Sequence, residues 1–376
     1  MNQNAFSHHN LSRDMYSREN DIINPKYENS TYVTNMAYPK GTVNPVEKKT
    51  TTKIINIDSL FRDNYESTSA SNFTWNLPEP VKNVIAMKVV AMELPNVWYS
   101  ISSKLNNNQF YIYLYNVRDS TDTTSGYHDE VHTITIPDGN YMAPNFMNSL
   151  NNYLTNMPTA VDNKFNGLHF LCVDVSPFTT KTTIRTFVSS ESGNCPYNLT
   201  DPYYSPNFYF EIDFNTSDET DHNAFKKTLG WFLGFRKSTY IVTSENQFID
   251  NISDSTGSVT YKYCLQSESS YGSTIQNYIY IDLNDFNRNE STDTISAPTE
   301  NGYIGNNVMA RISVSTLFNS TLFDNASDRV YKQRDYYGPV RISKMQIKLL
   351  NKFGDVIDLI GNDFSMALEL TVLYSL

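Results

Sequence analysis

Apolar residues recur at every second position along this chain, in one segment after another from the fifties to the final residue. In residues 110–115, Phe, Ile and Leu alternate with three tyrosines, and residues 208–214 and 366–372 repeat the alternation with other side chains. A period of two is typical of β-strands that bury one face. The pattern therefore predicts an all-β body, built as a sandwich or a barrel.

Residues 81–94 differ from this pattern because, after Lys82 and Asn83, they are apolar on both faces apart from Lys88 and Glu93. Such a run is typical of a central strand, and Pro95 ends it because proline cannot donate a ladder hydrogen bond. The remaining strands are expected at residues 54–57, 73–77, 110–115, 133–136, 168–175, 183–188, 208–214, 239–242, 259–265, 278–283, 308–317, 340–350 and 364–374.

Two segments follow helical spacing instead. Residues 146–154 place their apolar side chains on one face behind Pro144, a favourable position for a helix start. Residues 224–235 do the same, although Gly230 and Gly234 weaken a helix there. Glycine beside bulky rings indicates tight packing of a short helix on a sheet. We expect both helices to close the open ends of the β body.

The long polar connections between strands favour antiparallel sheets over βαβ units, and the jelly roll is the natural candidate. Residues 351–354 supply Asn and Gly for a hairpin between the last two long strands. We expect residues 53–376 to form one antiparallel jelly-roll sandwich. One enlarged roll is favoured over two in tandem because residues 81–94 and 340–350 resemble core strands of one body, although the length also accommodates two.

Residues 1–52 lack this periodicity and are rich in Asn, Ser, Thr and Tyr with scattered prolines. This composition predicts an N-terminal arm that is flexible alone and extends over a neighbouring subunit. The residues expected to make those contacts are Tyr16, Ile22, Ile23, Tyr32 and Tyr38.

Composition adds a surface suited to protein contact. Hydrophobic residues make up 39% of the 376 positions, enough for a core, and aromatic residues 14%, with 27 Tyr and 21 Phe.

The net charge of -11 argues against general nucleic-acid binding. The three cysteines lack paired spacing, so neither a disulfide framework nor a zinc site is expected, and a reducing compartment fits best. With no signal-peptide pattern and no membrane-spanning run, we expect a soluble protein made in the cytosol.

Two groups of residues are candidates for a protein interface. Tyr111, Tyr113 and Tyr115 share one strand face and offer broad rings with a polar tip, so a partner or a second sheet is expected to cover them. Basic residues gather near the C-terminus, where Arg341, Lys344 and Lys348 form either a solvated face or a docking surface for an acidic partner or lipid headgroups. The whole basic group is Arg329, Lys332, Arg334, Arg341, Lys344, Lys348 and Lys352.

No arrangement of residues points to catalysis, a cofactor or a metal. His128 and His132 have helical spacing but lie in a predicted strand without a third ligand. The carboxylate pairs Asp58 with Asp63 and Asp282 with Asp285 fall at strand ends, where aspartate caps backbone amides. We expect Arg62 to be held between Asp58 and Asp63 as a local ion pair. Phosphate loops, nucleophile elbows and Cys/His nucleophile patterns are absent from the sequence.

Seven segments between residues 53 and 376 together resemble virion proteins of nucleocytoplasmic large DNA viruses. They are Ile-Asp-Ser-Leu-Phe-Arg-Asp at 57–63, Phe-Thr-Trp-Asn-Leu-Pro-Glu-Pro-Val-Lys-Asn-Val at 73–84, Met-Glu-Leu-Pro-Asn at 92–96, Ile-Pro-Asp-Gly-Asn-Tyr at 136–141, Leu-Gly-Trp-Phe-Leu-Gly-Phe-Arg at 229–236, Tyr-Gly-Pro-Val at 337–340 and Asn-Asp-Phe-Ser at 362–365. The order of these segments along the chain carries the likeness.

The resemblance implies a minor capsid protein with a jelly-roll fold, placed beside or beneath the major capsid protein or at the vertices as a penton. It implies partners among major and minor capsid proteins, homo- and hetero-oligomers in the shell, proximity to an inner membrane, and assembly in the host cytoplasm into the virion. It implies no cofactor and no catalytic residue. The alternatives left open are a carbohydrate- or receptor-binding β domain on the virion surface and a glycoside-active β-sandwich enzyme.

Overall fold

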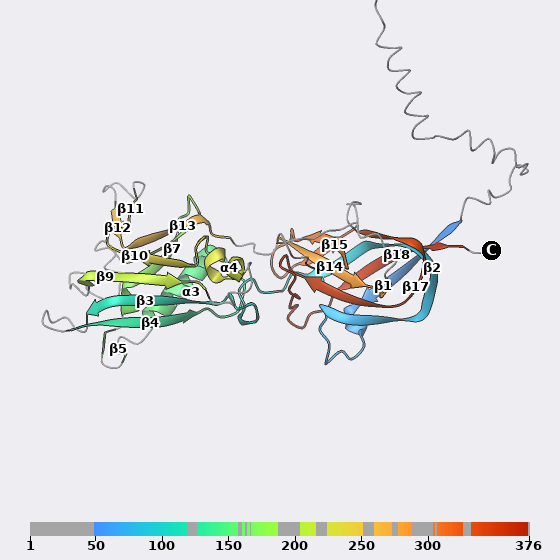
Figure 1. Cartoon of the computed structure of the whole chain (residues 1–376), viewed down its shortest axis with the longest axis horizontal. Helices are drawn as coiled ribbons and strands as arrows, with labels where there is room; N and C mark the ends of the chain where they lie inside the picture. Colours follow the sequence, from blue (N-terminus) through green and yellow to red (C-terminus); the bar gives the residue numbers. More distant parts are fainter. Residues whose placement is uncertain are drawn as a thin grey trace, which may run out of the picture. The chain divides into compact units, whose positions relative to one another are not determined.

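The expected fold class, an all-β jelly-roll sandwich of antiparallel strands, is confirmed (Figure 1). In the computed structural model of the chain, the described residues are 49–118, 126–156, 160–161, 164–165, 167–186, 204–215, 224–250, 259–272, 277–287, 304, 307–325 and 332–374. Their strands fall into two groups of sheets. We call the group built from residues 50–95 and 278–373 the terminal body, and the group built from residues 109–270 the inserted body.

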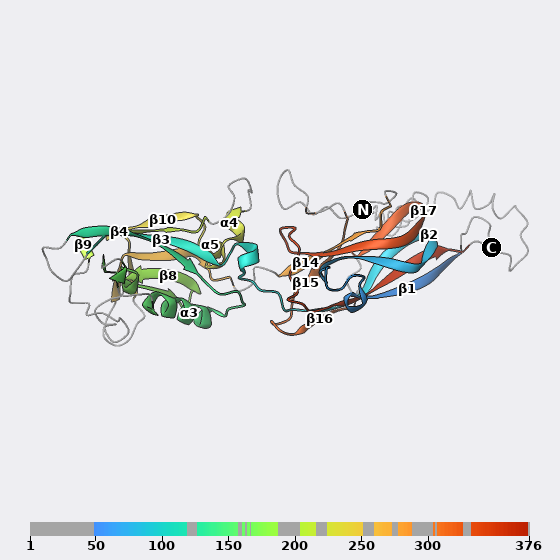
Figure 2. The same ribbon diagram turned by 90° about the horizontal axis from the view of Figure 1, so that it is seen from below.

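The terminal body is one seven-stranded sheet with the order β1-β18-β2-β17-β14-β15, and β16 pairs with β2. Its long strands β2 and β17 lie side by side (Figure 2). They pair over much of their length, with three shifts in register. The strands are β1 (Thr50–Asp58), β2 (Asn72–Pro95), β14 (Tyr278–Asn284), β15 (Val308–Ser313), β16 (Thr321–Asp324), β17 (Gln333–Leu350) and β18 (Ser365–Leu373).

The inserted body contains a four-stranded sheet, β10-β9-β3-β4, and a three-stranded sheet, β13-β8-β7. Two further strand pairs, β5 with β6 and β11 with β12, accompany them. The strands are β3 (Gln109–Arg118), β4 (Tyr127–Thr135), β5 (Ala160–Val161), β6 (Lys164–Phe165), β7 (Leu171–Val175), β8 (Lys181–Thr186), β9 (Tyr204–Asp213), β10 (Thr239–Val242), β11 (Gln247–Asp250), β12 (Val259–Lys262) and β13 (Cys264–Ser270). The helices are α3 (Ala143–Asn156), α4 (Ala224–Lys227) and α5 (Leu229–Phe232), and short 3-10 turns cover Ser59–Phe61, Ser103–Leu105 and Gly167–Phe170.

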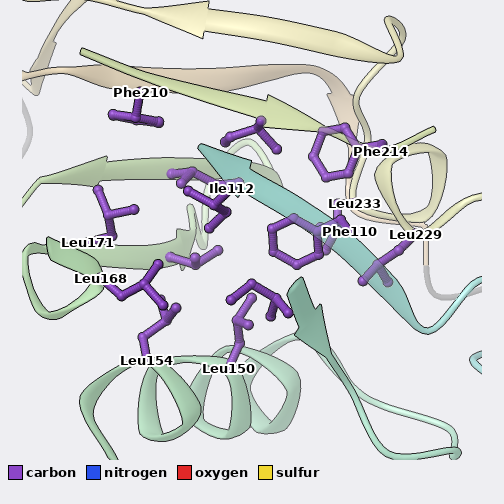
Figure 3. Close-up of a cluster of buried hydrophobic side chains, with 14 of the residues drawn as sticks. Phe110, Ile112, Leu150, Leu154, Leu168, Leu171, Phe210, Phe214, Leu229 and Leu233 are labelled. Atoms are coloured by element: carbon purple, nitrogen blue, oxygen red, sulfur yellow. The ribbon is translucent and has the colours of Figure 1, made fainter. Parts of the chain in front are cut away.

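The inserted body has its own core, and α3 contributes to it. Phe110 and Ile112 of β3 lie in one cluster with Leu150 and Leu154 of α3, whose side chains point toward the strands (Figure 3). The outward positions between Phe110 and Leu114 are tyrosines, so the alternation in the sequence separates a dry face from an open one. The helix expected at residues 146–154 is confirmed within α3.

The terminal body buries alternate residues of β17 and β18. On β18 the buried positions are Met366, Leu368, Leu370 and Val372, as the period of two predicts. On β17 a register shift between Ile342 and Lys344 changes the phase of the alternation, and the buried series continues at Met345, Ile347 and Leu349. A bulge of this kind inserts one residue while the core face is kept.

The strands belong to two sets. β2 and β17 lie together in the terminal body, as expected for core strands of one body, and the strands between them in sequence form a second set of sheets around a separate core. Two expectations need correction. Residues 351–354 do turn, but β18 pairs beside β1 and β2, so this turn is not a hairpin between β17 and β18. The helix expected over 224–235 is two single turns, because Thr228 caps the start of α5.

The cysteines described by the structure are buried thiols outside any disulfide. Cys172 on β7 and Cys264 on β13 stand opposite the same residue of β8, Arg185, so a strand separates them. Burial raises the pKa of the Cys264 thiol to about 11. At pH 8 this leaves a thiolate fraction of about one in a thousand, and the thiolate is the reactive form.

A variant with Cys195→Ser, which removes the cysteine outside the described residues, is therefore expected to react very slowly with Ellman's reagent while native. Unfolding should expose both remaining thiols to rapid reaction. Since the folded pKa is raised, the native reaction should accelerate as the pH rises from 8 toward 11. Rapid modification of the folded variant at pH 8 would contradict the buried placement.

Candidate protein interface

The tyrosine row of β3 lies on the face of the four-stranded sheet opposite the core. Tyr111, Tyr113 and Tyr115 are each half-buried, between residues of β4 on one side and of β9 on the other. Tyr115 stacks on Tyr209 of β9 with ring centroids 4.4 Å apart and an interplanar angle of 14°. Desolvation, followed by the nearby Glu211 carboxylate, raises the pKa of the Tyr115 hydroxyl, which donates a long hydrogen bond of 3.5 Å to that carboxylate.

The rest of this sheet face is apolar and acidic. Val131 on β4 and Ile241 on β10 are 66% and 61% exposed, so both aliphatic side chains are open to a partner. At the outward positions whose side chains the structure describes, there are carboxylates and no lysine or arginine. We call this surface the tyrosine face; its members are Tyr111, Tyr113, Tyr115, Asp129, Val131, Thr133, Tyr209, Glu211, Asp213, Thr239 and Ile241.

The three basic residues predicted on β17 also share one face. Arg341 and Lys344 are exposed and Lys348 is half-buried, because the bulge after Ile342 keeps all three on the side away from the core. Lys344 Nζ lies 4.5 Å from the centroid of the Phe286 ring, a cation-π distance. We call Arg341, Lys344 and Lys348 the basic strand.

Two other members of the basic group, Lys332 and Arg334, are buried and paired with carboxylates. Lys332 Nζ lies 2.5 Å from Asp324 Oδ1, with the lysine side chain 5% exposed. Arg334 Nη1 lies 3.5 Å from Asp285 Oδ1, and that carboxylate also accepts a hydrogen bond from the Tyr336 hydroxyl. Burial and the Asp285 carboxylate raise the pKa of Tyr336, so its hydroxyl stays a donor. The sequence therefore predicted one basic patch where the structure separates surface cations from buried ion pairs.

The expected arm contacts, Tyr16, Ile22, Ile23, Tyr32 and Tyr38, lie outside the described residues. They remain predictions, as do the proposed domain limits 1–52 and 53–376.

Arg62 is held by a different partner from the one expected. Its Nη1 lies 2.6 Å from Asp363 Oδ1, and its side chain is only 7% exposed. Asp58 instead accepts a hydrogen bond from the Leu60 amide, and Asp63 accepts one from the Asn76 side chain. The expected local ion pair was wrong because Arg62 points toward Asp363, in the segment just before β18. A partner so distant in sequence cannot be found from local spacing.

Asp363 accepts hydrogen bonds from Arg62 and from two further side chains. We call this hydrogen-bonded network the arginine clasp. Ser59 Oγ donates to Asp363 Oδ1 over 2.8 Å, and Tyr65 donates to Oδ2 over 2.9 Å. Backbone groups also connect these two segments. The Ser59 amide donates to the Phe364 carbonyl, and the Phe364 amide donates to Ser59 Oγ. The clasp consists of Ser59, Arg62, Tyr65, Asp363 and Phe364. It joins the first and last of the seven segments that carry the resemblance.

The two histidines that resembled a metal pair share a carboxylate instead. His128 Nε2 lies 2.9 Å from one oxygen of Glu130, and His132 Nε2 lies 2.6 Å from the other. The Gly167 amide donates to the same carboxylate. Within the described part of the chain, no group of three or more potential ligands is arranged to hold a metal ion.

No protein-family model matches the sequence, and no curated protein matches it. Among solved structures, the crystal structure of the mavirus penton protein has a TM-score of 0.41 and 8% sequence identity, covering 86% of this chain and 99% of that one. A chain in the cryo-electron microscopy structure of the Sputnik virophage has a TM-score of 0.36 and 14% identity, covering 87% of this chain and 98% of that one.

Sequence reasoning missed the acidic half of the tyrosine face. Glu211 and Asp213 follow Tyr209 in the alternation of β9, but their position beside Tyr113 and Tyr111 depends on the pairing of β9 with β3. The available signal was the alternation itself, because an outward phase shared by both strands places tyrosines and carboxylates on one face.

Among the described helices, none has both the length and the apolar character needed to cross a bilayer.

Proposed function

We propose that this chain is a structural subunit of the shell of a large icosahedral DNA virus, a minor capsid protein that contacts the major capsid protein and stabilises the shell. The observation that carries the proposal is the tyrosine face, a broad sheet surface with exposed Val131 and Ile241 beside a row of rings. Exposed apolar patches of this kind mark protein-protein interfaces. A position at the vertices as a penton is one form of this role.

The arginine clasp supports the proposal, because it joins two of the seven segments that carry the resemblance. Residues 57–63 and 362–365 meet in one hydrogen-bonded network that fastens β1 to the entry of β18. Their part in this chain is thus to hold a scaffold together, as a shell subunit requires. Repeated by symmetry, even modest contacts between such scaffolds add up to a stable assembly.

We extend the proposal to the partners and the arm. Other minor capsid proteins are further neighbours, the basic strand faces an acidic protein or a headgroup layer, and residues 1–52 extend over a neighbouring subunit. The protein acts by contact and catalyses no reaction. Synthesis and assembly take place in the host cytoplasm, and the finished protein resides in the virion.

The test is to locate the chain in purified particles. We expect quantitative mass spectrometry of detergent-stripped virions to find it in the shell fraction at a fixed ratio to the major capsid protein, and a reconstruction of the particle to show its two sheet bodies in the shell. A viral protein made abundantly in infected cells but not packaged serves as the control. Its absence from stripped shells, or turnover of a substrate by the isolated chain, would overturn the proposal.

A further inference from the structure

The tyrosine face and the basic strand have complementary chemistry. The face combines rings with the carboxylates Asp129, Glu211 and Asp213, and no described outward side chain on it is basic. Rings and carboxylates together attract lysine and arginine, by cation-π contact and by ion pairing. What this face lacks is a cation.

The basic strand supplies that chemistry on the same chain. In the described part of the chain, neither Arg341 nor Lys344 forms an ion pair, and Lys344 already rests on the ring of Phe286 in the way it would rest on a tyrosine. Lys348 is partly neutralised, since it lies opposite the buried Asp282 in the pairing of β17 with β14. Arg341 and Lys344 are therefore the cations that remain available.

We infer that the tyrosine face binds the basic strand of a second copy of this chain. The inference rests on the proposed function and names a partner for it. Because two different surfaces meet, the contact is heterologous, so copies join head to tail and either close into a ring or continue as a lattice. A symmetric contact of two tyrosine faces would instead oppose like charges, which is unfavourable.

The size of the face sets the expected strength. Four strands about 4.8 Å apart, each with roughly three outward side chains, cover on the order of 400 Å². A standard stable interface takes about 800 Å² from each partner. A single contact should therefore be weak, and it should gain strength by repetition in an array.

The experiment is sedimentation of the full chain at rising concentration, with charge reversals at the centre of each surface. We expect the wild-type chain to self-associate, and added salt to weaken this association. Glu211→Lys and Lys344→Glu should each weaken self-association by about tenfold. An equal mixture of the two variants should recover it, because each then meets an opposite charge on the other. Mixing would not restore self-association if the variants were misfolded.

Matched controls reverse the same charges elsewhere. Glu66→Lys and Lys53→Glu alter exposed residues outside both surfaces and should leave association unchanged. A wild-type chain that stays monomeric at every concentration would overturn the inference. So would a mixture that fails to associate, or association that is insensitive to salt. The inference would also be overturned if Glu211→Lys weakened association while Lys344→Glu left it unchanged.

The two proposals fail in different ways. A chain that is present in shells but shows no charge-dependent self-association overturns this inference and leaves the proposed function standing. A chain that self-associates as expected but is missing from particles overturns the proposed function, while the contact between copies stands.

Discussion

Replacing Asp363 by Asn is expected to lower the free energy of unfolding by about 3 kcal/mol, the lower end for breaking an ion pair that is largely buried. The variant keeps the shape of the side chain but leaves the Arg62 guanidinium, 7% exposed, without its counter-charge. It also weakens the hydrogen bonds that Ser59 and Tyr65 donate to the carboxylate. Urea unfolding followed by intrinsic fluorescence measures the change.

Asp63→Asn is the matched control, because Asp63 adjoins Arg62 in sequence and carries the same charge. Its carboxylate accepts a hydrogen bond from Asn76 in an exposed setting, so we expect a loss below about 0.5 kcal/mol. Equal losses in the two variants would mean that Arg62 is held by its sequence neighbours after all. A loss confined to Asp363→Asn establishes the clasp.

Gly230→Ala is expected to destabilise the chain by about 3 kcal/mol, because it overpacks a full core. A Cβ on Gly230 would lie 2.3 Å from the ring of Phe214, which is itself fully buried and stacked on Phe235. Neither ring has room to move away. Thermal unfolding monitored by circular dichroism measures the loss.

Gly272→Ala makes the same chemical change where space is available. A Cβ there meets only the Phe232 carbonyl oxygen, at 3.6 Å, an ordinary contact. We expect a change within about 0.5 kcal/mol, as for other substitutions without a clash. If both alanine variants were equally stable, the close approach of Gly230 in α5 to the Phe214 ring would be refuted.

The strands could be predicted because burial on one face imposes a period of two wherever a strand forms. The same logic gave the tyrosine row its outward position. The boundaries were less accurate where backbone chemistry intervenes. Residues 167–170 form a 3-10 turn before β7, and Thr228 splits the second helical segment through its cap on the Trp231 amide. These interruptions depend on local hydrogen bonds that hydrophobic spacing does not report.

Pairing across long separations could not be predicted from the sequence. The clasp joins Ser59 to Asp363 across 304 positions, and the acidic residues of β9 reach Tyr111 and Tyr113 only through strand register. The insertion of a second set of sheets between β2 and β14 could not be predicted for the same reason. Two strands that look alike in hydrophobicity do not indicate whether a second core is inserted between them.

The insertion between β2 and β14 also determines the order in which the chain can acquire its structure during translation. The inserted body draws its strands from one continuous stretch, residues 109–270, so it can condense while the ribosome is still making the rest. β1 and β2 must wait for β18, which lies between them. During this interval their unpaired edges are open to other nascent chains. Chaperone protection is needed most for the sheet that was begun first and is completed last.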